Sequence, residues 1–151
     1  MATVSQLLMI KGQTVHTIDR MATVFDAISK MVERNVGALI VLEGMRPCGI
    51  LTERDYLRKV ALFGRASRTT RVEEIMSSGL ISVGPDTSME ECMSLMTRNH
   101  IRHLPVFDGS QLEGIVSIGD IVKYLANDRL SQIEQLTAYV QGSEFVYRTS
   151  A

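Results

Sequence analysis

Two short stretches of the chain place a hydroxyl side chain three positions before a carboxylate. Thr52 precedes Asp55 in the first stretch, and Ser117 precedes Asp120 in the second. In both, a glycine and two apolar residues come first, which is typical of a buried strand that turns into a helix. A hydroxyl and a carboxylate at a helix N-terminus can bind a phosphate and a sugar diol. The structural alternative is a capping box, which only closes the helix.

The two motifs belong to a longer internal repeat with an offset of 65 residues (120 − 55 = 65). This offset aligns residues 15–60 with residues 80–125 without a gap, and it places Gly44 on Gly109. There are only two copies, so the pattern indicates a duplicated unit rather than a solenoid.

Each copy is predicted to form a β-α-β-β-α unit. In the first copy, strands are expected at 15–18, 38–42 and 48–51, and helices after Thr23 and from Thr52. Each half alone is too small to bury its apolar faces well, so the halves are expected to pack together. The predicted inward faces of these two helices consist of Val24, Phe25, Ile28, Met31 and Val32, and of Tyr56, Leu57, Val60 and Phe63.

The segments outside the repeats have simpler patterns. The connector between the copies contains three arginines and no large apolar residue, which favours an exposed linker and leaves open a contribution to phosphate binding. Beyond the second copy, Ser131 is expected to cap a helix that Gly142 ends, with Ile133, Leu136 and Val140 on one side. The predicted division is repeat 1 at 4–63, linker at 64–71, repeat 2 at 72–127, and C-terminal helix and tail at 128–151.

Composition excludes several classes of function. The chain has 151 residues, 45% of them apolar, and 16 basic against 17 acidic residues, which gives no electrostatic case for binding nucleic acid or an anionic membrane. No apolar run is long enough to span a bilayer, and the first residues lack the pattern of a signal peptide. Cys48 and Cys92 have no metal-ligand spacing, nor do the three histidines, so no metal site is expected and both thiols are predicted to be reduced in a cytoplasmic protein.

The repeat resembles a tandem pair of cystathionine β-synthase (CBS) domains, a Bateman module, over about residues 4–127. The resemblance rests on the two motifs and on Ile101-Arg102-His103-Leu104-Pro105-Val106. The residues that follow each motif resemble those of stand-alone CBS-pair proteins, and so does the segment 133–142. The resemblance implies an α/β (α+β) fold of two β-α-β-β-α repeats packed with pseudo-two-fold symmetry, plus a C-terminal helix. It also implies a flat homodimer.

The family resemblance implies that adenosine nucleotides bind in clefts between the repeats. Asp55 and Asp120 would accept ribose hydroxyls, and Thr52 and Ser117 would donate to ribose or phosphate. The phosphate would be held by a basic pair, Arg102 and His103, from the opposite repeat. The equivalent pair in the first repeat is Gly37 and Ala38, so the second cleft is expected to bind weakly, stay empty, or use another cation, with Arg54 and the linker arginines as candidates. Adenine is placed near Val15 and His16 and near Leu80 and Ile81.

The resulting hypothesis is a non-catalytic regulatory module that binds an adenosine nucleotide and signals to an unidentified partner protein. AMP is the first expectation, with ADP, ATP and NAD as alternatives, and no cofactor is required. No nucleophile–base pair is visible, so the protein is not expected to be an enzyme. Two alternatives stay open: a protein–protein adaptor without nucleotide binding, and a thiol-based redox protein.

Overall fold

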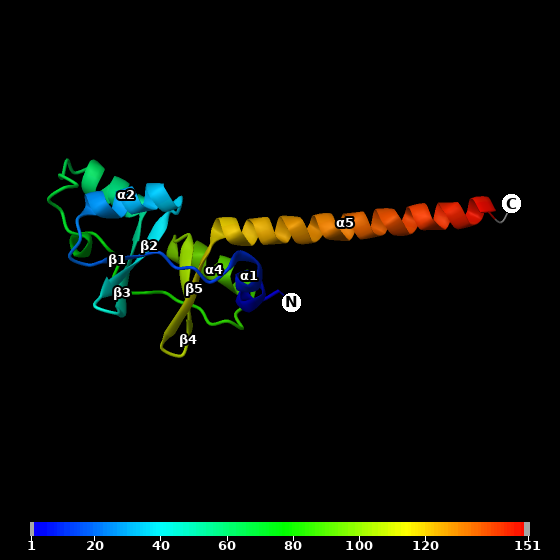
Figure 1. The fold of residues 1–151 in the computed structure, drawn as a ribbon, viewed down its shortest axis with the longest axis horizontal. Helices are drawn as coiled ribbons and strands as arrows, with labels where there is room; N and C mark the ends of the chain where they lie inside the picture. Colours follow the sequence, from blue (N-terminus) through cyan, green and yellow to red (C-terminus); the bar gives the residue numbers. More distant parts are fainter. Residues whose placement is uncertain (1, 150–151) are drawn as a thin grey trace.

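The computed structural model describes residues 2–149, with side chains to residue 138. A short helix, α1, precedes the repeats, and a long helix, α5, extends from the second repeat (Figure 1). None of the described helices is long and apolar enough to cross a membrane. The elements in chain order are α1 (Val4–Lys11), β1 (Thr17–Asp19), α2 (Val24–Arg34), β2 (Ala38–Glu43), β3 (Arg46–Thr52), α3 (Glu53–Tyr56), the π-helical turn η1 (Leu57–Ala61), the 3₁₀ turn η2 (Val72–Glu74), α4 (Met89–Asn99), β4 (His103–Asp108), β5 (Gln111–Ser117) and α5 (Ile118–Thr149).

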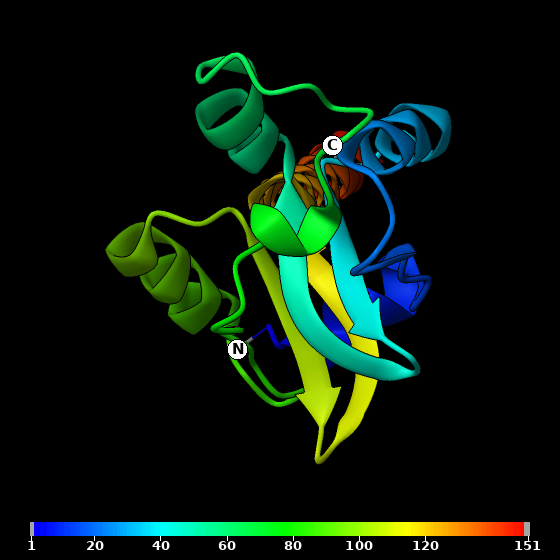
Figure 2. The same ribbon diagram turned by 90° about the vertical axis from the view of Figure 1, so that its left-hand side faces the viewer.

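The two β-hairpins confirm the repeat at the level of the backbone. Strand β2 pairs antiparallel with β3, and β4 pairs antiparallel with β5. Each pairing is interrupted by an irregularity after its fourth residue pair, and each hairpin turns at a glycine, Gly44 with φ 65° and Gly109 with φ 62°. A positive φ is accessible to glycine without steric cost, which explains the residue type at both turns. The hairpins of the two repeats lie side by side, with α2 and α4 on the outside (Figure 2).

The first strand of each repeat is shorter than its sequence pattern predicts. Strand β1 runs parallel to β2 but begins at Thr17, so Val15 and His16 lie before it. In the second repeat the equivalent segment makes only one isolated bridge, between Val83 and Val106. The second sheet therefore consists of β4 and β5 alone.

The helices α2 and α4 begin and end as the repeat predicts. Thr23 and Ser88 each accept a backbone N–H at 3.1 Å and cap the two N-termini. Asn35 and His100 end them in the left-handed conformation, with φ of 53° and 54°. One detail of the prediction is wrong: Phe25 and Val32 lie outside the buried face of α2, which consists of Val24, Ala27 and Met31.

The helix after Thr52 differs from its predicted form in length and register. It makes one α-helical turn, continues as the π-helical turn η1, and ends at Ala61. Val60 is buried as predicted, but Leu57 and Phe63 are 60% and 73% exposed. A π turn has more residues per turn than an α-helix, so the 3.6-residue period used for the prediction no longer holds beyond Tyr56.

A C-terminal helix is present, but its predicted start is wrong. Helix α5 begins directly after Ser117 and runs without interruption to Thr149, so Ser131 lies within it and Gly142 does not end it. No glycine or proline lies between Gly119 and Gly142. One internal glycine lowers helix stability by only about 1 kcal/mol. Ile133 and Leu136 are exposed, and the predicted position of Val140 lies outside the described side chains.

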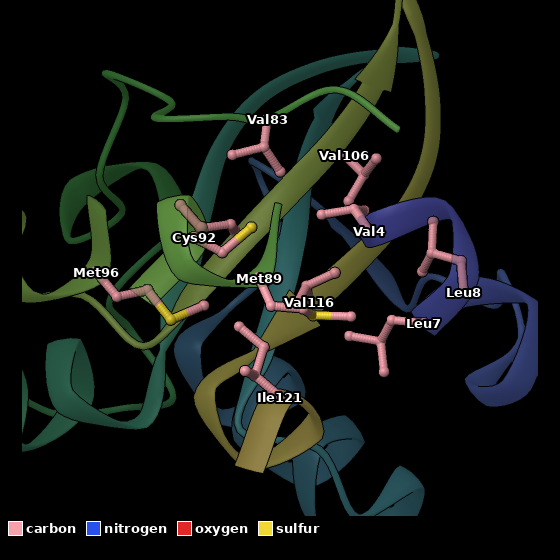
Figure 3. Packing of buried hydrophobic residues seen from close by; sticks show 11 residues of the cluster. Val4, Leu7, Leu8, Val83, Met89, Cys92, Met96, Val106, Val116 and Ile121 are labelled. Carbon is pink, nitrogen blue, oxygen red and sulfur yellow. The ribbon is translucent and has the colours of Figure 1, made fainter. Parts of the chain in front are cut away.

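Each repeat has its own apolar core, and each core is completed by the segment that precedes the other repeat. Helix α1 packs on the second repeat, where Val4, Leu7 and Leu8 are buried. Val72 and Ile75, at the start of the second repeat, are buried in the first. The leading segments thus cross and join the two repeats. Figure 3 shows the cluster around α1, including Met89, Cys92, Val106, Val116 and Ile121.

Candidate functional site

The two hydroxyl–carboxylate motifs form reciprocal caps. The amide N–H of Thr52 donates to Asp55 Oδ2 at 3.0 Å, and the amide N–H of Asp55 donates to Thr52 Oγ1 at 3.4 Å. Ser117 and Asp120 repeat this arrangement at 2.9 and 3.1 Å. The structural alternative is therefore present at both motifs. An ionised carboxylate has about four acceptor positions, so capping does not exclude ligand binding.

A cavity of about 460 Å³ lies between the two repeats at the first motif. It is lined by Thr52, Arg54 and Asp55 from the first repeat and by Arg102 and His103 from the second. The cavity thus brings the Thr52–Asp55 motif next to the Arg102–His103 pair from a distant part of the sequence. Arg54, a predicted candidate cation for the second cleft, lines the first cavity instead. Ile81 also lines the cavity, at the position predicted for adenine.

Three residues predicted near adenine do not line this cavity. Leu80 is adjacent to Ile81 in the sequence, but only Ile81 lines the cavity. Val15 and His16 lead into the first repeat and are the equivalents of Leu80 and Ile81, so the pseudo-symmetry assigns them to the second cleft.

Several lining residues were not predicted from the sequence. Arg58 and Lys59 follow Asp55 by three and four positions, which is one helical turn, and this spacing was an available signal. Glu53 and His100 also contribute polar groups. The remaining unpredicted lining residues are Gly37, Ile50, Ser77, Gly79, Ile101 and Pro105, which make the rest of the wall largely apolar.

Cations outnumber carboxylates around the cavity. Lys59 pairs with Asp55 Oδ1 at 3.1 Å and also donates to the carbonyl of Ile75 at 2.9 Å. Arg54 reaches across to the carbonyl of His100 at 3.5 Å. Within the described chain, Arg58 and Arg102 form no ion pair with a carboxylate. Their guanidinium groups can therefore bind an anionic ligand without first breaking a salt bridge.

His103 is not a permanent cation in this site. Burial lowers the pKa of its imidazole, and the nearby charges of Lys11 and Arg102 lower that pKa further, against a smaller opposite effect from Asp120. The ring is therefore mainly neutral at pH 7, with one nitrogen available as a donor and the other as an acceptor. Charge in the predicted basic pair is supplied by Arg102.

The carboxylate of the second motif pairs with a lysine. Asp120 Oδ2 pairs with Lys11 Nζ at 2.5 Å, and Lys11 also donates to the carbonyl of Ile115 at 2.5 Å. This contact lowers the pKa of Asp120 although burial alone raises it. The cation beside Asp120 is thus Lys11 of α1, and neither Arg54 nor a linker arginine, the predicted candidates, pairs with Asp120 in the described chain. The linker arginines contact other groups: Arg65 pairs with Glu74, Arg68 lies over the ring of Phe25, and Arg71 contacts Met21.

The thiols and potential metal ligands show no second site. Burial raises the pKa of Cys48 and raises that of Cys92 to about 11. Reactive cysteines have lowered pKa values, so the direction of both shifts does not favour a reactive thiol. Across residues 2–138, no three His, Cys, Asp or Glu side chains are grouped as metal ligands.

Comparison with known proteins decides the family. A family model described as the CBS domain matches residues 4–62 and 72–127, which together cover most of the chain. The chain belongs to the CBS-domain family. A curated relative, the mitochondrial CBS domain-containing protein CBSX3 of Arabidopsis thaliana, is 45% identical over 125 residues, covering 80% of this chain and 61% of the relative. The CBS domain-containing protein YhcV of Bacillus subtilis is 38% identical over 115 residues, 76% of this chain and 81% of the relative.

Solved structures of CBS-domain proteins have the same fold. A signal-transduction protein with CBS domains from Burkholderia ambifaria superposes with a TM-score of 0.82 and 48% identity, covering 84% of this chain and 96% of that one. A hexameric CBS-CP12 protein from cyanobacteria superposes with a TM-score of 0.73 and 37% identity, covering 81% and 70%. Tandem CBS-domain proteins are generally regulatory, and this chain has their fold.

Proposed function

We propose that this CBS-domain protein is a sensor that binds one adenosine nucleotide in the cavity between its repeats and signals occupancy to a partner protein. The observation that supports this most strongly is the convergence of Asp55 and Thr52 from one repeat with Arg102 from the other on a cavity of about 460 Å³. Cavities of this size accommodate small-molecule ligands. The proposal leaves the protein without a catalytic step of its own.

The lining suggests how a nucleotide would be oriented. Ile50, Ile81 and Pro105 offer apolar surface for a base. Asp55 offers a carboxylate to the ribose hydroxyls, in competition with Lys59 for Oδ1. Arg58 and Arg102 offer cations to phosphate. AMP satisfies all three groups with the fewest charges, and ADP, ATP and NAD place additional phosphate near the same cations.

The test is a thermal-shift and calorimetry screen with AMP, ADP, ATP, NAD, S-adenosylmethionine and GMP. A ligand that binds only the folded state raises the melting temperature by mass action. Adenosine nucleotides are expected to raise it and to bind with a Kd in the micromolar range, on the order of −8 kcal/mol. If no nucleotide raises the melting temperature or gives heat of binding, the adaptor hypothesis replaces the sensor hypothesis.

We also propose a homodimer formed through the helices that follow the two motifs. Leu57 and Val122 are equivalent positions of the two repeats, and they are 60% and 58% exposed. Exposed apolar side chains at equivalent positions of the two repeats are typical of an interface. The cyanobacterial CBS-CP12 relative is described as hexameric, which supports oligomerisation in this family. The compartment is proposed to be the cytoplasm, although the relative CBSX3 is mitochondrial.

A further inference from the structure

The residue that distinguishes the two clefts comes from the segments leading into the repeats. By the 65-residue offset, Lys11 in the first repeat is equivalent to Met76 in the second. Near the first cleft, the backbone of Ser77 exchanges two hydrogen bonds with Ile50, at 2.9 and 3.0 Å. Near the second cleft, the equivalent carbonyl, that of Ile115, accepts instead from Lys11 Nζ at 2.5 Å. A charged side chain thus takes the place of a backbone bridge.

The Lys11 ammonium also contacts the carboxylate that a ligand would need. Its Nζ lies 2.5 Å from Asp120 Oδ2, an oxygen that already accepts the amide N–H of Ser117. Helix α1 is anchored by Val4, Leu7 and Leu8, which are buried in the second repeat. Lys11 ends this helix, so its side chain is delivered to Asp120 by a packed element and not by a loose terminus.

The opposite wall of the second cleft offers no compensating cation. The position equivalent to Arg102 is Gly37, which brings no charged side chain, and an added Cβ there would lie 3.2 Å from Glu53 Oε1, a group that lines the first cavity. Lys11 occupies the acceptor that would bind a ribose diol.

We propose that Lys11 is a resident occupant of the second cleft that holds Asp120 in place of a ribose, so that each chain binds one nucleotide and not two. This inference rests on the proposed function for the choice of ligand, but the Lys11–Asp120 contact itself does not. Replacing Lys11 by an uncharged residue opens a second site. Because Gly37 brings no cation, the opened site takes an uncharged ribonucleoside such as adenosine.

The experiment uses Lys11→Met, because methionine is the residue at the equivalent position of the other repeat. Wild-type protein and the variant are each titrated with adenosine by calorimetry while the first cleft is saturated with AMP. The wild type is expected to take up no adenosine, and the variant one per chain. The double variant Lys11→Met/Asp120→Ala is expected to lose this uptake. Lys123→Met is the matched control, because Lys123 lines one pocket together with Lys11 and Asp120, and the substitution removes the same charge.

Adenosine uptake by AMP-saturated wild type, or its absence in Lys11→Met, would overturn the proposal. A second measurement needs no ligand, so it tests the Lys11–Asp120 contact even if the protein binds no nucleotide. The pKa of the Asp120 carboxyl, followed by NMR, is expected to rise in Lys11→Met and to stay unchanged in Lys123→Met. An Asp120 pKa that does not respond to Lys11→Met overturns the contact whether or not any nucleotide binds. If AMP fails to bind the wild type, the sensor hypothesis is wrong, and adenosine titration without AMP still decides whether Lys11 closes the second cleft.

Discussion

Gly37 and Arg102 occupy the same position in the two repeats, yet only Arg102 carries a cation to the cavity between them. Their backbones are alike: the carbonyl of Gly37 accepts from the amide of Glu53 at 3.1 Å, and that of Arg102 from the amide of Ile118 at 2.9 Å. The repeat thus preserves its backbone geometry while the charge of the two clefts diverges.

This difference predicts the effect of Arg102→Ala. Loss of a charge-assisted hydrogen bond to phosphate costs about 1.5–3 kcal/mol, which corresponds to a roughly tenfold to hundredfold weaker Kd for AMP. Calorimetric titration of both proteins with AMP measures this change. Arg98→Ala is the control, because Arg98 is an exposed arginine of α4 that does not line the cavity. Equal AMP affinity in Arg102→Ala and wild type would show that Arg102 does not contact phosphate.

Asp55→Ala tests the ribose contact separately from the cap. Wild-type protein is expected to bind AMP more tightly than 2′-deoxy-AMP, because the carboxylate of Asp55 accepts the 2′-hydroxyl. In Asp55→Ala this preference should disappear, while loss of the cap lowers the free energy of unfolding by about 1 kcal/mol. Asp26→Ala changes the same position of a Thr-x-x-Asp motif away from the cavity, and it should retain the preference. A preference for AMP that survives in Asp55→Ala would mean that Asp55 is only a capping residue.

Much of this site could be predicted because the chain contains its own comparison. The 65-residue offset identifies both motifs and aligns Arg102 with Gly37. The spacing of Arg58 and Lys59 from Asp55 was an available signal, but it does not show which face of the helix borders the cavity, because that depends on how the repeats pack. Lys11 could not have been predicted, since it lies far from Asp120 in the sequence and its contact depends on how α1 packs on the second repeat. The exposure of Phe63 was missed because no local pattern indicates the π-helical turn η1.

The close approach of α1 to the second sheet predicts coupling between Leu8 and Gly114. A Cβ on Gly114 would lie 2.9 Å from Leu8 Cδ2, so Gly114→Ala is expected to lower the free energy of unfolding by about 1–3 kcal/mol. In a Leu8→Ala background the same substitution should cost less, with a coupling energy of roughly 0.5–3 kcal/mol. Urea denaturation of the four proteins measures it. Gly84→Ala is the control, because its nearest neighbour lies at 3.9 Å; strictly additive effects at Leu8 and Gly114 would contradict the packing described.

The buried thiol of Cys92 predicts a loss of stability at alkaline pH. Its pKa is about 11 in the folded protein and about 8.5 in an unfolded chain, so the folded state holds the proton more tightly. The contribution of the protonated thiol to the free energy of unfolding is fully present below about pH 8.5 and is lost as the pH rises toward 11. The difference in the free energy of unfolding between wild type and Cys92→Ala should therefore shrink over this range. A constant difference, or rapid alkylation of folded Cys92 at pH 8, would favour the redox hypothesis.

Leu57→Lys and Val122→Lys test the proposed homodimer. A charge on either exposed apolar side chain should convert a dimer into monomers, because burying an unpaired ammonium at an interface is strongly unfavourable. Sedimentation or light scattering at micromolar concentration gives the mass. Val32→Lys is the control, because Val32 is also exposed, at 76%, but lies on α2 rather than on the helices that follow the motifs. A wild-type protein that is monomeric with and without nucleotide would rule out this interface.

The crossing of the leading segments has a consequence for how the protein is made. Helix α1 is synthesised before the second repeat, but Val4, Leu7 and Leu8 are covered only when that repeat has been synthesised as far as Ile121. At about 5–20 residues per second, this delay of roughly 110 residues lasts on the order of 5–20 s. During that time the apolar side of α1 is available to chaperones or to the α1 site of another nascent chain. The α1 side of this core is therefore closed only after the second repeat has been made.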